Sequence, residues 1–242
     1  MAKKIYISPS SQTKNEYGAG NTTEAIQCRA IAKLLVTELA RCGFEAKTNV
    51  TGDMYARVDE SNAFGADLHV CIHTNAYNEK ISGTRIFCYK TDKTTISYGV
   101  SEAIMKTLAP ITPGTSDGIQ ARPELYEIVK TTAPCTYIEV DFHDVDDVAL
   151  WIIEHKSDIA VAIAKGICKY YGVAYKPAEN SPTKGAGRIN SIEDVPGWAK
   201  AETQALIDCG ALKGNGEGLD LSEDMLRCII INKRYVDSLM NK

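Results

Sequence analysis

The segment most informative about the fold is Asp67-Leu68-His69-Val70-Cys71-Ile72-His73. It is short and almost continuously apolar, as expected of a strand buried on both faces of a parallel sheet. On either side of this segment, apolar runs rich in β-forming residues predict further strands at residues 5–7, 44–49, 83–89, 125–129 and 135–140. Helical periodicity predicts helices between them, at residues 23–42, 55–64, 97–108 and 152–171. This alternation predicts an α/β fold, a mostly parallel sheet with helices on both faces, as in α/β/α phosphorylase- or hydrolase-like domains.

The chain is expected to divide where the sequence offers little to bury. Residues 176–189 are rich in Pro, Gly and Ser and predict a linker. We therefore expect one domain at residues 1–175 and a small all-α unit at residues 190–242. A unit of this size has a marginal core, so it is expected to lean on its neighbour or on another copy of itself.

Composition excludes several classes of protein. The formal net charge is -4, and no stretch forms the basic stripe of a nucleic-acid binder. No apolar run reaches the ~18 residues that a membrane-spanning helix needs, so membrane insertion is not expected. The basic start runs into Ile5-Tyr6-Ile7-Ser8-Pro9 with no secretory signal pattern, which predicts a protein held in the cytoplasm until it is released. The eight cysteines are scattered, as is typical of free thiols in a reducing compartment.

Polar residues fall at or just beyond three predicted strands, namely the loop Ser10-Ser11-Gln12, His73 and Glu139. Ligands of open α/β sheets bind at the carboxyl ends of the strands, so these residues predict a functional site there. Glu139 carries the strongest signal, because an unpaired carboxylate in a core strand is costly unless it is paired, metal-bound or catalytic. His73 alone is equally consistent with a structural histidine, and Glu24 alone with an acidic residue that complements a helix dipole.

The other polar residues near these strands are expected to support the site or the core. Asp141 and His143 follow Glu139 closely and are expected to orient a ligand or substrate at the same edge. His69 lies well before the end of its strand, which favours a packed core histidine.

Residues 3–175 resemble the amidase-3 family of zinc-dependent N-acetylmuramoyl-L-alanine amidases, in the form seen in phage and prophage endolysins. Several segments carry the resemblance, in the order of the family: residues 5–12, 21–24, 66–76, 83–84 and 133–142, with Arg57 and Ser61-Asn62 between them. The resemblance implies that Glu24 and His73 bind Zn²⁺ and that Glu139 is the general base. It also suggests that Asn75 and Arg57 position the substrate.

One departure concerns the first zinc ligand of the family, a histidine in the loop after the first strand. Here that loop is Ser10-Ser11-Gln12, which places Ser11 under the missing histidine and Gln12 beside it. Gln12 is expected to complete the metal site directly or through water, although an amide oxygen suits zinc less well than imidazole does. A ligand supplied by His143 is an alternative, and weak metal binding is another.

The C-terminal unit resembles a single surface-layer-homology-like wall-binding motif. The matching residues are 194–199, 205–214 and 221–227. The resemblance implies that this unit binds a secondary cell-wall polymer and that chains form homo-oligomers.

The combined expectation is a peptidoglycan hydrolase, an endolysin or autolysin, that acts on the bacterial cell wall. It would cleave the amide between N-acetylmuramic acid and L-alanine with zinc-activated water. A first alternative is a non-catalytic wall-binding protein on a degenerate amidase scaffold. A second is a metal-free glycosidase that uses Glu24 and Glu139, which would leave His73 without a role.

Overall fold

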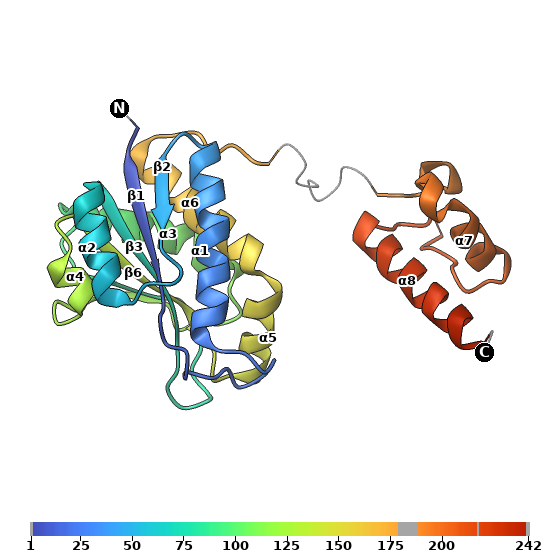
Figure 1. Cartoon of the computed structure of the whole chain (residues 1–242), viewed down its shortest axis with the longest axis horizontal. Coiled ribbons are helices and arrows are strands. Elements are labelled where there is room, and N and C mark those ends of the chain that lie inside the picture. The colour runs from blue at the N-terminus through green and yellow to red at the C-terminus, as the bar shows by residue number, and fades with distance from the viewer. Residues whose placement is uncertain (1, 179–187, 217, 241–242) are drawn as a thin grey trace. The chain divides into compact units, whose positions relative to one another are not determined.

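The structure is a computed structural model, and it describes residues 2–178, 188–216 and 218–240. The chain forms two compact units, Met1–Ala178 and Glu179–Lys242 (Figure 1). Residues 179–187, which make up most of the segment expected to be a linker, lie outside the described residues.

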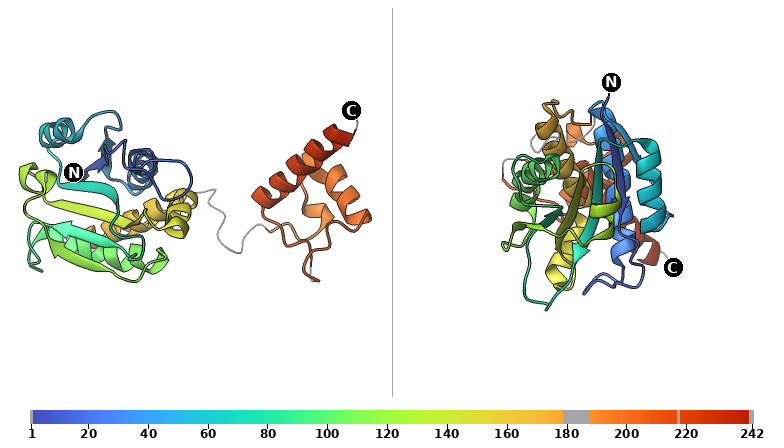
Figure 2. Two further views of the ribbon diagram at one scale, coloured as in Figure 1. Left: turned by 90° about the horizontal axis from the view of Figure 1, so that it is seen from below. Right: turned by 90° about the vertical axis from the view of Figure 1, so that its left-hand side faces the viewer.

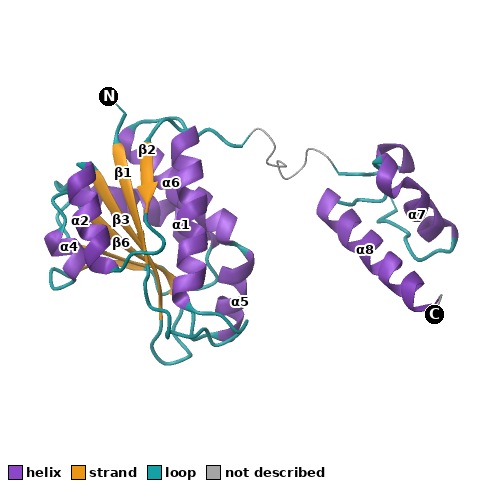
Figure 3. Cartoon of the chain, in the orientation of Figure 1, coloured by secondary structure: helices purple, strands orange, loops and turns teal. Residues whose placement is uncertain are grey.

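The first unit is built on one six-stranded sheet, drawn in orange in Figure 3. The strands lie in the order β2-β1-β3-β6-β4-β5. All neighbouring pairs are parallel except β4 with β6, which is antiparallel. Their bounds are β1 Lys4–Pro9, β2 Glu45–Thr48, β3 Leu68–Asn75, β4 Arg85–Cys88, β5 Gly118–Ala121 and β6 Cys135–Phe142. The predicted α/β fold with a mostly parallel sheet is confirmed.

Helices cover both faces of this sheet (Figure 2). One face carries α1 Glu24–Arg41, α3 Ile96–Leu108, α5 Asp146–Glu154 and α6 Lys156–Tyr171. The other carries α2 Met54–Phe64 and α4 Tyr126–Lys130, and a short 3-10 helix, η1 Ala109–Ile111, follows α3. The central strand β3 is therefore buried on both sides, which explains why its sequence is almost continuously apolar.

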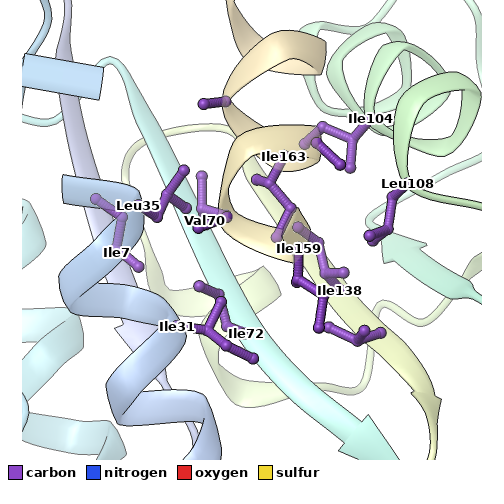
Figure 4. Close-up of a cluster of buried hydrophobic side chains, with 14 of the residues drawn as sticks. Ile7, Ile31, Leu35, Val70, Ile72, Ile104, Leu108, Ile138, Ile159 and Ile163 are labelled. Atoms are coloured by element: carbon purple, nitrogen blue, oxygen red, sulfur yellow. The ribbon is translucent and has the colours of Figure 1, made fainter. Parts of the chain in front are cut away.

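Strand alternation divides the side chains of β3 between two different environments. Leu68, Val70 and Ile72 are fully buried in the main core, against α1 and α6. Figure 4 shows Val70 and Ile72 near Ile31 and Leu35 of α1. The intervening residues of β3, which include His69 and His73, point to the opposite face. One face of the strand therefore stabilises the fold, while the other carries the polar chemistry.

Two expectations about secondary structure are wrong. Residues 125–129 were expected to form a strand, but residues 126–129 belong to the short helix α4, whose buried residues are Glu127 and Ile128. A five-residue run is too short for periodicity to separate a strand from a helix. The long helix expected at residues 152–171 belongs to two helices, which meet at His155, where the backbone leaves helical geometry (φ -107°, ψ 23°).

The second unit is helical. It contains η2 Ile192–Asp194, α7 Gly197–Asp208 and α8 Glu223–Met240, and a single bridge joins Ile189 to Leu221. Its small core includes Ala199 of α7 and Leu226 and Ile230 of α8. No helix among the described residues of the chain combines the length and apolar character needed to cross a membrane.

Candidate active site

Glu24 and His73 form a direct pair at the carboxyl edge of the sheet. Glu24 is the first residue of α1, His73 lies near the end of β3, and both side chains are buried. Glu24 Oε1 lies 2.8 Å from His73 Nδ1. The helix begins directly after the loop that follows β1, and this connection brings the first turn of α1 to the end of β3. Two ligands implied by the family resemblance therefore lie side by side.

The surroundings of Glu24 favour its charged form. Asn15 Nδ2 donates a hydrogen bond of 2.6 Å to Glu24 Oε2, and the backbone N–H of Thr74 lies 3.4 Å from Oε1. Burial alone would raise the pKa of Glu24, but the hydrogen bonds and the charge of His73 outweigh it and lower that pKa. The pKa of His73 is raised, because Glu24 and Glu139 together outweigh the opposite effect of burial. A metal cation bound by both side chains would take the place of the proton in this hydrogen bond.

Glu139 lies next to this pair without being bonded to it. It occupies the position on β6 that is paired with His73 on β3. Its Oε2 is buried and has no hydrogen-bond partner among the described residues. Burial, reinforced by the negative charge of Glu24, raises the pKa of Glu139 to about 8. A carboxylate with a pKa near neutrality and an unpaired oxygen is suited to accepting and returning a proton.

His143 is held close to the same edge by two residues that the sequence reasoning did not identify. Its Nδ1 lies 2.9 Å from the hydroxyl of Thr74, and its ring stacks on Tyr17 with 4.7 Å between ring centroids. The hydroxyl of Tyr17 lies 3.1 Å from the same Thr74 hydroxyl. Burial lowers the pKa of His143, and its Nε2 is buried with no partner among the described residues. The ring is fixed on one side and unpaired on the other.

Gln12, the residue expected to replace the missing histidine, is exposed on the loop after β1. Its backbone is anchored, since its N–H bonds Ser10 Oγ at 3.2 Å and its carbonyl accepts from the N–H of Ala25. Together with residues 13–15 it lines an open hollow of about 440 Å³. Asn15, from the same hollow, is the residue that bonds Glu24. Gln12 is therefore near Asn15 in the chain, but among the described residues no hydrogen bond joins its side chain to Glu24 or His73.

The two residues suggested to position substrate occupy different environments. Asn75 is half-buried at the end of β3, and its carbonyl accepts a 2.8 Å hydrogen bond from the N–H of His143. Arg57 is buried on α2, where it bonds the carbonyl oxygens of Asn49 and Pro9. Arg57 therefore braces the end of β1, whereas Asn75 lies at the end of the strand that carries His73.

Residues without a distinctive sequence signal complete the site. Tyr137 stacks on the ring of His73, with 4.4 Å between centroids. Tyr137 lies two positions before Glu139 on β6, so the two side chains share one face of the strand. This alternation is the sequence signal by which Tyr137 could have been predicted as a site residue. Tyr17, Thr74 and Asn15 had no comparable signal, because their contacts join loops to distant strands.

Two side chains at this edge have donor atoms that suit one divalent metal ion. The carboxylate of Glu24 and the imidazole of His73 are both zinc ligands, and they already lie within ligand-to-ligand distance. In the described part of the chain, no third carboxylate, imidazole or thiol joins them in a set whose ligand atoms all lie within 4.8 Å of one another. The nearby unpaired oxygen of Glu139 is the buried atom expected of a base beside such an ion.

An α/β sheet with a carboxylate–imidazole pair and a buried glutamate at its carboxyl edge is the architecture of a hydrolase. Residues 5–169 match the N-acetylmuramoyl-L-alanine amidase family Amidase_3, which is zinc-dependent in general. This match covers more than half of the 242 residues, and the chain belongs to this family of amidases.

Several known proteins resemble the chain in sequence or in fold. An uncharacterized 38.4 kDa protein of Clostridium perfringens is 29% identical over 161 residues, which are 62% of this chain and 46% of that protein. The chain thus spans about half the length of this curated relative. The amidase AmiC2 of Nostoc punctiforme has a TM-score of 0.63 at 21% identity, over 70% of this chain and 97% of that structure. The catalytic domain of CwlV from Bacillus (Paenibacillus) polymyxa var. colistinus has a TM-score of 0.60 at 21% identity, over 71% and 99%. The two structural likenesses show the shared fold.

Proposed function

We propose that the chain is a peptidoglycan hydrolase of the endolysin or autolysin type. It cleaves the amide bond between the lactyl group of N-acetylmuramic acid and L-alanine. One observation carries this proposal: the unpaired, buried Oε2 of Glu139 lies beside the Glu24–His73 pair, at the sheet edge where α/β domains bind ligands.

Each residue of the site has a distinct task in this reaction. Glu24 and His73 would hold Zn²⁺, with Gln12 as the third ligand, and a bound zinc ion would polarise the scissile carbonyl and acidify water. Glu139 accepts the proton of the attacking water at Oε2 and then returns it to the leaving amine of L-alanine. Because a water-derived hydroxyl ends on the carbonyl carbon and a proton on the nitrogen, the products are a carboxylic acid and a free amine.

The remaining polar residues orient the reactants. His143 presents its unpaired Nε2 while Thr74 and Tyr17 fix its ring, so it can donate to or accept from the substrate without reorganisation. Asn75 offers a carboxamide at the end of β3. Arg57 bonds the carbonyl of Pro9 and would position the substrate through the loop that carries Gln12.

The second unit would deliver the enzyme to its substrate. We assign it the binding of a secondary cell-wall polymer and the formation of homo-oligomers, on the basis of its resemblance to a surface-layer-homology motif. The enzyme would remain in the producing cell until release and then act on the bacterial wall.

The test is the release of new L-alanine amino termini from purified cell walls by the full chain, with zinc and with a chelator. We expect release with zinc only. Glu139→Ala should retain metal and lose release, because Glu139 is a base and not a ligand. Release of reducing sugar in place of amine would show a glycosidase. Equal amine release in the presence of chelator would contradict a zinc enzyme.

The incomplete ligand set favours one alternative, a non-catalytic wall-binding protein on the amidase scaffold. The observation behind it is that Gln12 is exposed and that, in the part of the chain the structure describes, its side chain makes no hydrogen bond to Glu24 or His73. This alternative predicts that the chain sediments with walls but releases no amine at any zinc concentration.

A further inference from the structure

A second set of metal-ligand side chains lies on the α2/α4 face of the sheet, apart from the Glu24–His73 pair. It consists of His69 and Cys71 of β3 and Cys135 of β6, all three buried. One ligand atom from each residue lies within 4.8 Å of the other two, and this is the one such set of three found among the described residues. The proposed amidase chemistry uses none of these side chains.

The separation of the two sulfur atoms matches that imposed by a tetrahedral zinc ion. Cys71 Sγ and Cys135 Sγ are 3.7 Å apart. Two Zn–S bonds of about 2.3 Å at a tetrahedral angle place their sulfurs about 3.8 Å apart. The thiols therefore need almost no movement to bind one ion.

The strand geometry disfavours a disulfide as the reason for this approach. His69 is the residue that pairs with Cys135, and Cys71 lies two residues further along β3. A strand spacing of about 4.8 Å and a rise of about 3.3 Å per residue place the Cα atoms of Cys71 and Cys135 about 8 Å apart. Disulfides need Cα atoms within about 7 Å, so closing the bond would distort the centre of the sheet.

His69 is already oriented as a ligand. Its Nδ1 lies 2.9 Å from the hydroxyl of Ser61, which fixes the ring. Glu127 Oε1 lies 3.2 Å from Nε2. Glu127 is not among the three residues whose ligand atoms all lie within 4.8 Å of one another, so it orients the imidazole of His69. A hydrogen bond from Ser8 Oγ fixes the same carboxylate oxygen.

The charge balance also favours an ion at this buried position. Binding of Zn²⁺ to two thiols displaces two protons to solvent, so the net charge of the site does not change. The buried guanidinium of Arg57 lies within electrostatic range of Glu127 and compensates its charge. The ion therefore adds no unpaired charge to the interior.

We propose that His69, Cys71 and Cys135 bind a structural zinc ion, with Glu127 orienting His69. This ion would join β3 to β6, and the contact between Glu127 and His69 would link the site to α4. Because the site is enclosed, it would be loaded as the chain folds. It is distinct from the zinc proposed for catalysis, and it does not depend on the amidase activity.

The experiment separates the two metal sites. The full chain carrying Glu24→Ala and His73→Ala is unfolded with reductant and chelator, refolded with Co²⁺ or Zn²⁺, and dialysed. We expect one ion per chain, a thiolate-to-cobalt charge-transfer band, and two sulfur neighbours at about 2.3 Å from zinc by X-ray absorption. No retained ion, a zinc shell without sulfur, or the loss of two free thiols to a disulfide would overturn the proposal.

Substitutions then assign the ligands. Adding Cys71→Ala and Cys135→Ala should abolish both the bound ion and the charge-transfer band. Cys88→Ala, at a buried cysteine outside the set, is the matched control and should retain both. A band that survives loss of Cys71 and Cys135 would contradict the assignment. The X-ray absorption measurement needs neither cysteine variant, so misfolding of a variant leaves it decisive. Failure here leaves the wall-hydrolysis assay unaffected.

Discussion

His73 on β3 and Glu139 on β6 are paired neighbours in the sheet, yet the buried Oε2 of Glu139 has no hydrogen-bond partner. His73 directs its Nδ1 to Glu24 instead, at 2.8 Å. The strand register therefore places a carboxylate beside an imidazole while α1 supplies the bonded partner.

Glu139→Gln should stabilise the metal-free chain at alkaline pH. Burial raises the pKa of Glu139 to about 8, whereas an unfolded chain has the ordinary value of 4.5. Between these values the folded chain binds more protons, so the free energy of unfolding falls as pH rises, by up to about 1.4 kcal/mol per pH unit. We expect little difference in Tm between variant and parent near pH 4.5 and a higher Tm for the variant above pH ~8. Glu45→Gln, at an exposed position, is the control and should show no such divergence.

Gln12→His should tighten zinc binding. An imidazole is a better zinc ligand than an amide oxygen, and residue 12 lies on the anchored loop beside Asn15, the partner of Glu24. We expect at least about a tenfold lower Kd for zinc, comparable with the effect of a strong metal-site contact. Lys14→His places an imidazole elsewhere on the same hollow and controls for nonspecific binding. Equal tightening by both variants would show that residue 12 does not face the ion.

Thr74→Val should impair catalysis more than folding. The hydroxyl of Thr74 contacts both His143 Nδ1 and the hydroxyl of Tyr17, so its loss leaves two buried polar groups unpaired. We expect a loss of about 1–3 kcal/mol in stability. In the amidase assay kcat should fall while the zinc content stays unchanged. Tyr17→Phe removes only the outer contact and should have the smaller effect. An unchanged kcat in Thr74→Val would exclude a positioning role for Thr74.

Gly166→Ala should destabilise the first unit at the contact between α3 and α6. A Cβ at Gly166 would lie 2.5 Å from Ile104 Cα, which is backbone and cannot move without shifting α3. Overpacking of this kind costs about 1–3 kcal/mol, or a drop of several degrees in Tm. Lys169→Ala on the exposed side of α6 is the control and should change Tm little. A Tm for Gly166→Ala equal to the parent's would show that the helices separate at low cost.

The class of fold could be predicted from the sequence, because apolar strand segments alternate with segments that have the periodicity of a helix. The wrong predictions fall where the local pattern is short or continuous. The run at residues 125–129 overlaps α4, whose buried Glu127 is explained by its contacts with His69 and Ser8. The helix expected at residues 152–171 is interrupted at His155, where the backbone leaves helical geometry. The spacing of the apolar residues continues across this break, so the sequence pattern does not reveal it.

Three features could be predicted from the amino-acid sequence alone: the alternation of strands and helices, the resemblance to the amidase family, and the unusual place of Glu139 within a core strand. Periodicity and burial cost act locally, so they can be read along the chain. Which side chains contact one another became clear only from the tertiary structure. Glu24 contacts a histidine 49 residues away, and Cys71 approaches a cysteine 64 residues away. Such contacts depend on strand order and register, which the packing of the whole sheet determines and no short segment encodes.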